Sequence, residues 1–202
     1  TTQPLADVLR GGETIVSAWV TLPDALIAEL VARSDFGAVT LDVQHGLHDA
    51  GSLMRCIGGV SLAAKPSLVR LAVDDFAMAS RALDFGADGV IAPMINSAAD
   101  ARRLVAATKY PPLGERSWGP ARAMALTGEA DQNAYLAHAN DKTLAIAMIE
   151  TRTAFDALDD ILAVDGIDGV FVGPSDLSVA LSGGAKVAPD DIIVDEPIRE
   201  IA

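Results

Sequence analysis

The sequence predicts a single α/β domain on a parallel sheet, with a TIM-type (β/α)8 barrel as the expected architecture. Six short apolar runs recur along the chain, mostly about 23 to 28 residues apart, which is the length of a β-α repeat. The runs are continuously apolar rather than alternating, as expected of strands with both faces buried. An open doubly wound sheet is the alternative, which the absence of a glycine-rich dinucleotide motif after the first run weakens.

The predicted strands can be followed along the chain in order. They are IVSAWV from Ile15, AVTLDV from Ala38, PSLVRLA from Pro66, GVIAP from Gly89, TLAIAMI from Thr143 and GVFV from Gly169. The interval between the fourth and the fifth contains a helical pattern over Ser97–Thr108, a loop, and a shorter helical pattern near Gln132–Ala139. Thr21, Asp74 and Ser97 precede helical patterns and are expected to cap them.

The end of the chain departs from a complete barrel. The 202 residues are fewer than the roughly 250 that an eight-stranded barrel typically needs. The residues after GVFV carry little strand signal: Ile192–Val194 is a short apolar run, and Pro197–Ala202 resembles the start of a helix. We therefore expect one domain over residues 1–202, a barrel that lacks its last strands and helices in this chain.

Charge and composition exclude several classes of protein. The net charge of −13, with 15 basic residues, argues against nucleic acid or an anionic membrane as the main partner. No apolar run approaches the roughly 20 residues of a membrane span, and no secretory leader opens the chain. Cys56 is the single cysteine, which suits a reducing cytoplasm, and its helical spacing with Leu53, Ile57 and Val60 predicts a core residue.

Two carboxylates follow neighbouring strands in the stretch Ile149–Leu177. Glu150 comes directly after TLAIAMI, and Asp176 comes shortly after GVFV. Parallel neighbours would bring both acids to the same rim of the sheet, where they can hold a hard divalent cation and leave its other positions to water and substrate. The alternative is that both are solvated loop acids.

The second and third strands end in further candidates for chemistry. Asp42 and His45 are three residues apart across a turn, close enough for the carboxylate to orient the imidazole for acid/base work. A capping aspartate and a surface histidine are the alternative. Arg70 lies within an apolar strand, where it can grip a substrate carboxylate or form a structural ion pair with Asp42 or Glu150.

The remaining polar candidates carry weaker signals. Arg116 and Arg122 lie in a long loop with three prolines and two glycines, and they can bind an anionic substrate tail or serve the structure alone. Asp84 ends a helical pattern and is a candidate for a contact elsewhere in the site or in another subunit, whereas His48 is expected to be solvated. None of the four lysines follows a strand, which favours metal chemistry over an imine mechanism.

Several motifs together resemble the HpcH/HpaI aldolases, which are metal-dependent class II pyruvate aldolases of the phosphoenolpyruvate/pyruvate barrel superfamily. The motifs are DVQHG at Asp42–Gly46, LVR at Leu68–Arg70, LDFGADGVIAPM at Leu83–Met94, YPPLGERSWGPARA at Tyr110–Ala123, IET at Ile149–Thr151 and GVFVGPSDL at Gly169–Leu177. The resemblance runs from about Trp19 to Leu181. It is specific because the motifs occur jointly and in order.

The resemblance implies a role for each matching residue. Glu150 and Asp176 would bind Mg²⁺, Mn²⁺ or Co²⁺, Arg70 would hold pyruvate, and His45, oriented by Asp42, would move the proton. The implied substrate-binding residues are Arg70, Trp19, Arg122, and Ser175 and Asp176, the last two through backbone amides. Met148 stands where many relatives have Gln, so a substrate hydrogen bond from that position is not implied.

The implied reaction is retro-aldol cleavage of a 4-hydroxy-2-oxo acid to pyruvate and an aldehyde, through a metal-stabilised pyruvate enolate, in aromatic or sugar acid catabolism. Family members are typically hexamers, so a homo-oligomer is expected. Two other functions stay open from the sequence. One is a citryl- or malyl-CoA-type lyase of the same superfamily, and the other is a non-catalytic barrel fragment that acts only in an assembly.

Overall fold

In the computed structural model, which describes residues 3–201, all six predicted runs form strands of one parallel sheet. The strands lie side by side in chain order, which confirms the predicted α/β class and its β-α repeat. Their bounds are β1 Ser17–Val20, β2 Ala38–Asp42, β3 Ser67–Arg70, β4 Gly89–Ala92, β5 Leu144–Ile149 and β6 Gly169–Val172. None of the helices in residues 3–201 is long and apolar enough to cross a membrane.

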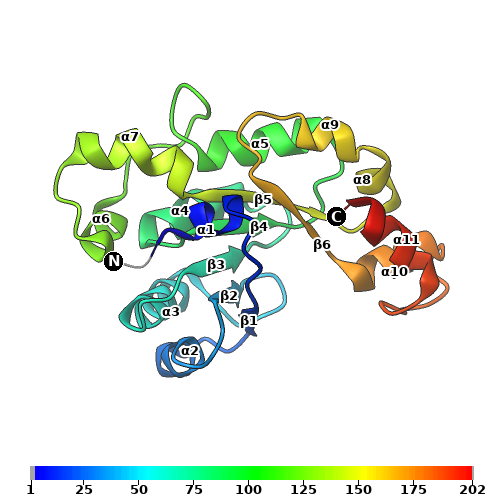
Figure 1. Ribbon diagram of the computed structural model, residues 1–202, viewed down its shortest axis with the longest axis horizontal. Coiled ribbons are helices and arrows are strands. Elements are labelled where there is room, and N and C mark those ends of the chain that lie inside the picture. Colours follow the sequence, from blue (N-terminus) through cyan, green and yellow to red (C-terminus); the bar gives the residue numbers. More distant parts are fainter. Residues whose placement is uncertain (1–2, 202) are drawn as a thin grey trace.

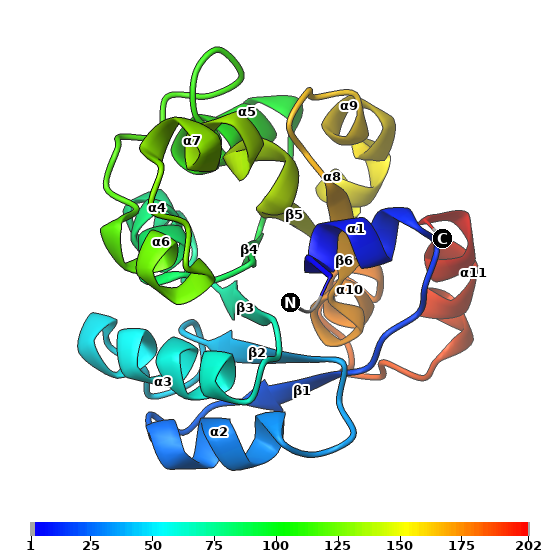
Figure 2. The same cartoon turned by 60° about the vertical axis from the view of Figure 1, so that its left-hand side comes forward.

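The sheet curls into a half-barrel with helices on its outer face, while the first helix lies over its inner side (Figure 2). The helices are α1 Leu5–Arg10, α2 Ala25–Ala32, α3 Ala50–Leu62, α4 Phe76–Phe85, α5 Ala98–Thr108, α6 Ala121–Thr127, α7 Gln132–Lys142, α8 Arg152–Asp156, α9 Leu158–Leu162, α10 Pro174–Leu181 and α11 Ile192–Ile201. The curl brings side chains of the two edge strands together: the ring centroids of Trp19 in β1 and Phe171 in β6 lie 5.7 Å apart.

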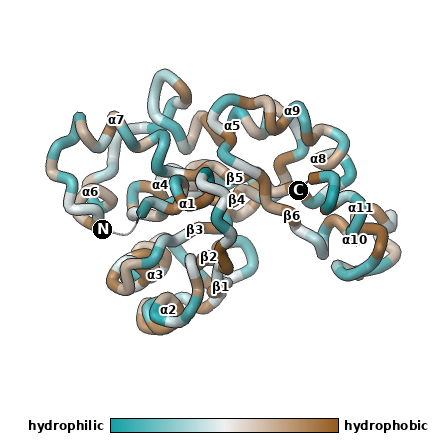
Figure 3. Tube along the Cα trace, viewed as in Figure 1, coloured by the Kyte–Doolittle hydropathy of each residue, from teal (hydrophilic) through white to brown (hydrophobic). Residues whose placement is uncertain are grey.

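Alternation along the strands divides the apolar residues between the two faces of the sheet. Val39, Leu41 and Val69 point outward into the large core beneath the helices. Leu68 and Met148 point inward into a smaller cluster, which α1 closes with its own apolar residues (Figure 1). Colour along α3 in Figure 3 alternates between apolar and polar, as expected of a helix with one buried face.

Cys56 lies on the buried face of α3, as its helical spacing predicted. Burial raises the pKa of its thiol to about 11, so the thiol stays protonated and unreactive at neutral pH. The residue therefore serves packing.

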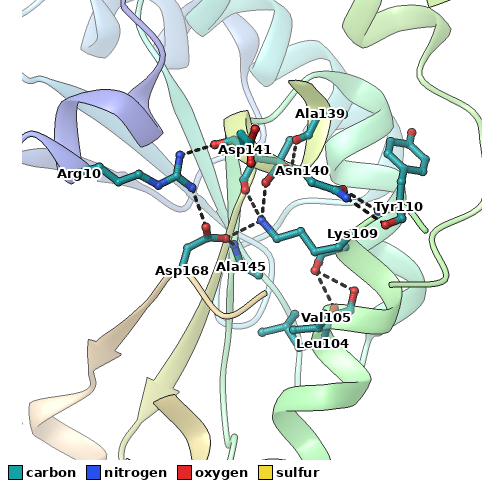
Figure 4. Close-up of polar contacts among 12 residues, drawn as sticks. Arg10, Leu104, Val105, Lys109, Tyr110, Ala139, Asn140, Asp141, Ala145 and Asp168 are labelled. Atoms are coloured by element: carbon teal, nitrogen blue, oxygen red, sulfur yellow. Dashed lines mark hydrogen bonds and ion pairs between the residues drawn. The ribbon is translucent and has the colours of Figure 1, made fainter. Parts of the chain in front are cut away.

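The amino-terminal ends of the strands are held together by a buried lysine (Figure 4). Lys109 Nζ donates to the Asp168 carboxylate at 2.6 Å and to the backbone oxygens of Asn140 and Thr143 at 2.9 and 2.6 Å. Arg10, from α1, donates to the other carboxylate oxygen of Asp168 at 2.9 Å. This network ties α1, the end of α5 and the end of α7 to the segments that lead into β5 and β6. Its role is structural, in agreement with the absence of a lysine from the strand ends.

Some expectations about helix boundaries are wrong. Ser97 caps α5 as predicted, by accepting from Asp100 N at 3.2 Å. The cap of α2 is Asp24 rather than Thr21, and the cap of α4 is Asp75 rather than Asp74. In each case the true cap lies closer to the helix, where its carboxylate reaches the backbone N–H groups of the first turn.

The short apolar run near the carboxyl end is also helical. Ile192–Val194 forms the first turn of α11, which continues through Pro197 to Ile201. A three-residue apolar run fits a short strand or one helical turn equally well, and here the helix prevails because Val194 is buried within it.

Candidate active site

The carboxyl ends of β1, β2 and β3 bring a cation, a carboxylate and an indole together. Arg70 grips Asp42 with two hydrogen bonds, from Nε to Oδ1 at 2.9 Å and from Nη2 to Oδ2 at 2.5 Å. The two residues are register partners on neighbouring strands, so the pair lies across the sheet. Trp19 Nε1 donates to Asp42 Oδ2 at 3.1 Å, and the guanidinium lies 5.0 Å from the centroid of the indole. The ion pair that the sequence offered as an alternative for Arg70 is therefore present.

Asp42 also shapes the loop that carries His45. Its Oδ1 accepts from the backbone N–H groups of Gln44 and His45 at 3.1 and 3.2 Å. The carboxylate thus contacts His45 through the main chain, whereas the sequence led us to expect a contact with the imidazole. Gly46 completes the turn, because a Cβ there would lie 2.0 Å from the backbone oxygen of Asp42. The His45 side chain is exposed at the rim.

These contacts set the charge of Asp42. Burial alone would raise the pKa of the carboxyl, but hydrogen bonds from Arg70, Trp19 and the His45 backbone outweigh it and hold the pKa below its usual value. Asp42 is therefore a carboxylate throughout the neutral range, and Arg70 stays fixed beside it.

His48 does not lie in solvent, contrary to prediction. It is buried, and its Nε2 lies 3.3 Å from the backbone oxygen of Val20. Burial lowers its pKa, so the imidazole is neutral at physiological pH. It ties the loop after β2 to the end of β1, which supports the rim from behind.

Glu150 is the second buried acid of the rim, directly after β5. Its Oε1 accepts from the backbone N–H of Met94 at 2.8 Å. Its other oxygen faces the opening turn of α10, because a Cβ on Gly173 would lie 2.8 Å from Oε2. Met94 has a positive φ of 57°, which costs a residue other than glycine about 1–3 kcal/mol and is common at functional sites. The backbone just after β4 thus adopts an unfavourable conformation at the residue whose N–H reaches Glu150.

The surroundings of Glu150 combine burial with charges of both signs. Burial raises the pKa of its carboxyl, the Met94 N–H lowers it, and the negative charge of Asp176 raises it again. Arg70 and His45 lie near enough to lower it slightly. Asp176, Arg70 and His45 are thus each close enough to act on Glu150, and the four groups follow the ends of β2, β3, β5 and β6.

The two acids suit a divalent cation. Asp176 lies in the first turn of α10, and its negative charge acts on the Glu150 carboxylate, which is buried and has no ion-pair partner among residues 3–201. A cation between two carboxylates would relieve both the desolvation and the repulsion. Within residues 3–201 no group of three or more His, Cys, Asp or Glu side chains is placed to hold a metal.

The backbone of α10 adds donors to the same rim. Pro174 occupies the first helical position, and the N–H groups of Ser175 and Asp176 have no acceptor within the helix because they belong to its first turn. Such N–H groups bind anionic oxygens.

Other polar candidates lie away from this rim. Arg122 Nη2 contacts the backbone oxygen of Met54 in α3 at 3.4 Å. Arg116 is buried and pairs with Asp84 at 2.6 Å, while its guanidinium stacks 4.5 Å from the centroid of Tyr110. The ion pair accounts for Asp84 at the end of α4, and it gives Arg116 a structural role in the long loop.

The hollows in the surface do not coincide with the rim. One, of about 600 Å³, is lined by helices α5 and α9, and another, of about 250 Å³, lies between α1 and strands β5 and β6. Neither is lined by any of the predicted site residues. The candidate site is therefore defined by the predicted charged residues that end the strands at the rim, which line neither of these hollows.

Three features of the rim were not found from the sequence. Phe171 packs against Trp19, Met94 donates to Glu150, and Asn96 links the loop after β4 to Thr151. Phe171 could have been found from the sequence, because residues two apart in a strand point to the same face, and Phe171 lies two residues before Gly173 at the rim. Nothing in the residue type of Met94 marks a left-handed backbone.

Comparison with known proteins identifies relatives of the chain. The family model described as HpcH/HpaI aldolase/citrate lyase matches residues 16–194. The hydroxypyruvate/pyruvate aldolase of Rhizorhabdus wittichii is 40% identical over 190 residues, covering 94% of this chain and 74% of that protein. The 2-keto-3-deoxy-L-rhamnonate aldolase of Escherichia coli is 34% identical over 202 residues, covering 99% of this chain and 75% of that protein.

Solved structures show the same arrangement. An HpcH/HpaI aldolase from Desulfitobacterium hafniense superposes with a TM-score of 0.87 at 28% identity, covering 99% of this chain and 76% of that one. The citrate synthase SbnG superposes with a TM-score of 0.86 at 27% identity, covering 98% of this chain and 76% of that one. Both are longer than this chain, and the shared part includes the whole six-stranded sheet.

Proposed function

Because the chain belongs to the HpcH/HpaI aldolase/citrate lyase family, we propose that it is a metal-dependent aldolase that cleaves a 4-hydroxy-2-oxo acid to pyruvate and an aldehyde. Aldolases are carbon–carbon lyases, so the chain is an enzyme of that class. The finer proposal is supported by the position of Glu150, a buried acid directly after β5, and of Asp176 in the first turn of α10 after β6, with Asp176, Arg70 and His45 each near enough to act on Glu150. The proposed architecture is a (β/α)8-type barrel, whose active groups lie at the carboxyl ends of strands.

Substrate binding follows from the donors at the rim. The carboxylate of the oxo acid would lie against the N–H groups of Ser175 and Asp176 at the start of α10. Arg70 has five N–H donors and uses two of them on Asp42, so the others are available to the keto and carboxylate oxygens. Asp42 therefore acts as a rigid support for Arg70.

A divalent cation held by Glu150 and Asp176 would supply positive charge where the enolate oxygen develops negative charge. His45 is the group that would take the proton of the 4-hydroxyl as the C3–C4 bond breaks and then return a proton to the product. The exposed imidazole is placed for exchange with solvent, and its main chain is fixed by Asp42. Met148 presents an apolar side chain at the inner face, where it excludes water beside Gly173.

The aldolase proposal is favoured over an acyl-CoA lyase because the two named enzymes at 34% and 40% identity are aldolases. Small oxo acids and aldehydes are accordingly the proposed partners. Self-association into a homo-oligomer stays a prediction, to be checked by sedimentation of the purified protein.

The proposal is tested by measuring pyruvate release from a panel of 4-hydroxy-2-oxo acids, with and without a chelator, and with malyl-CoA as the competing substrate. Release from an oxo acid that stops on chelation and returns with Mn²⁺ or Mg²⁺ is expected. Glu150→Ala should also abolish the metal-dependent exchange of pyruvate methyl protons with solvent. Exchange at the wild-type rate in that variant would contradict the assignment.

Two glycines of one strand region provide a matched pair for the same assay. A Cβ on Gly173 would lie within 3 Å of Met148 and of Glu150, whereas a Cβ on Gly169 meets nothing within 4 Å. Gly173→Ala should therefore displace the Glu150 carboxylate and lower activity at least about tenfold. Gly169→Ala should retain the wild-type rate. Equal rates in the two variants would mean that activity does not depend on the position of the Glu150 carboxylate.

A further inference from the structure

The two oxygens of Glu150 have different surroundings. Oε1 accepts from the Met94 backbone N–H at 2.8 Å, while Oε2 faces Gly173 and the opening turn of α10, where Asp176 lies. Oε2 is thus the oxygen that lies beside Gly173, at the start of the helix that carries Asp176. A carboxylate with one oxygen fixed by an N–H offers a cation its other oxygen.

The N–H that fixes Oε1 belongs to a backbone held in an unusual conformation. Met94 has a φ of 57°, which L-residues with side chains adopt only where the surroundings demand it. The Asn96 amide provides a restraint, because its Nδ2 donates to the backbone oxygen of Met94 at 3.0 Å. The peptide groups on either side of Met94 are therefore directed at two different partners, Glu150 and Asn96.

The other end of the Asn96 amide reaches the chain next to Glu150. Its Oδ1 accepts a hydrogen bond from Thr151 Oγ1, and Thr151 also caps α8 by accepting from Ala154 N at 3.0 Å. The backbone N–H of Asn96 donates to Asp100 Oδ2 at 3.3 Å, which anchors it to the first turn of α5. Asn96 thus joins the loop after β4 to Thr151, the neighbour of Glu150, and we call these hydrogen bonds the Asn96 bracket.

We propose that Asn96 is a positioning residue, which holds the Met94 N–H on Oε1 of Glu150 and so leaves Oε2 as the single oxygen of this residue for a divalent cation. The inference rests on the proposed metal-dependent function and adds to it a basis for choosing the metal. Mg²⁺ and Mn²⁺ accept single carboxylate oxygens in octahedral sites, whereas Ca²⁺ favours more ligands and often takes both oxygens of a carboxylate. The bracket therefore disfavours Ca²⁺.

The test measures metal binding without relying on activity. Metal-free protein is titrated with Mn²⁺, and free Mn²⁺ is followed by its electron paramagnetic resonance signal, with Ca²⁺ added as a competitor. Asn96→Ala should bind Mn²⁺ about 10- to 100-fold more weakly, because residues that orient a metal ligand typically contribute that much. Its Ca²⁺ affinity should change less, so the preference for Mn²⁺ over Ca²⁺ falls.

Matched variants separate the bracket from general damage. Thr151→Ser keeps the hydroxyl and should bind as wild type, whereas Thr151→Val removes it and should follow Asn96→Ala. Asn133→Ala, at an exposed position in α7, should bind as wild type. Circular dichroism checks the fold of each protein, and the Thr151 pair decides the question should Asn96→Ala fail to fold.

The outcomes distinguish this inference from the function beneath it. Wild-type Mn²⁺ affinity and selectivity in both Asn96→Ala and Thr151→Val would overturn the role of Asn96. If Glu150→Gln loses Mn²⁺ binding in the same experiment, the proposed metal site is still supported. Absence of Mn²⁺ binding in the wild type, or its survival in Glu150→Gln, overturns the metal site and the inference with it.

Discussion

At the scale of single residues, the rim is organised around buried charges that are satisfied in different ways. Asp42 has donors on both oxygens, from Arg70, from Trp19 and from the following loop. Glu150 has a neutral N–H on one oxygen and the negative charge of Asp176 nearby. The first arrangement holds a charged pair rigid, and the second leaves an acid that binding of a cation would stabilise.

Removing Arg70 should therefore damage the fold as well as the chemistry. Arg70→Ala leaves Asp42 as a buried charge without its cation, and loss of one partner of a buried pair costs about 3–5 kcal/mol. The double variant Arg70→Met, Asp42→Asn removes both charges and should recover much of that stability. Urea unfolding measures both effects.

The exposed pair of Arg33 with Glu29 is the matched control, and Arg33→Ala should cost less than about 1 kcal/mol. Equal losses from Arg33→Ala and Arg70→Ala would mean that the Asp42 pair is no more than a surface contact.

The same pair predicts a pH dependence. The folded pKa of Asp42 is lower than the unfolded value of about 3.9, so the unfolded chain binds the proton more readily. The stabilisation is fully present above about pH 4 and is lost as the pH falls through the folded pKa. The difference in stability between the wild type and Asp42→Asn should be constant at neutral pH and shrink below about pH 4. A difference that does not change down to about pH 2 would contradict the shift.

At the scale of elements, helix starts depend on single side chains. Asp24 caps α2 by accepting from the N–H groups of Leu26 and Ile27 at 2.8 and 3.1 Å. Thr21 lies three residues earlier and contributes only its backbone oxygen, to Leu47 N at 2.9 Å. Asp24 therefore contributes a side-chain cap, and Thr21 contributes a backbone contact.

Asp24→Ala should lower the free energy of unfolding by about 1 kcal/mol, whereas Thr21→Ala should change it by less than about 0.5 kcal/mol. Thermal unfolding of the two variants beside the wild type measures the difference. A larger loss of unfolding free energy in Thr21→Ala than in Asp24→Ala would indicate that Thr21, the cap expected from the sequence, is the true cap.

The strands and their order could be predicted from the sequence, but the partners of the site residues could not. The existence and order of all six strands follow from the apolar runs, because a short continuous apolar run is typical of a buried strand, whereas several strand ends differ from the predicted runs by one or two residues. The grouping of Glu150, Asp176, Arg70 and His45 follows from parallel topology. The partner of each group does not follow: Asp42 binding Arg70 rather than the His45 ring depends on side-chain directions that only the packed sheet sets. Met94 donating to Glu150 depends on a backbone angle that its residue type disfavours.

At the scale of the whole molecule, the two ends of the half-barrel have separate tasks. The carboxyl ends of the strands hold the acids and arginine proposed for chemistry. The amino-terminal ends hold the Lys109 network and the α1 helix that covers the inner cluster (Figure 4). This division is typical of barrels, in which polar groups at the amino-terminal end serve stability.

Lys109→Met should therefore destabilise the fold without a direct effect on the rim. The change keeps an apolar side chain of similar length but leaves two backbone oxygens and part of the Asp168 carboxylate without a donor. Asp168 keeps Arg10 and the Ala145 N–H, so the expected loss is about 3 kcal/mol, at the lower end for a broken buried pair.

The matched control is Arg10→Ala, at a half-exposed position, which should cost less than about 1 kcal/mol. Denaturant unfolding gives the losses, and the Mn²⁺ titration at a temperature where both variants are folded should give wild-type affinity. Weakened Mn²⁺ binding in folded Lys109→Met would show that the two ends are coupled, and a loss equal to that of Arg10→Ala would show that burial adds nothing to the lysine pair.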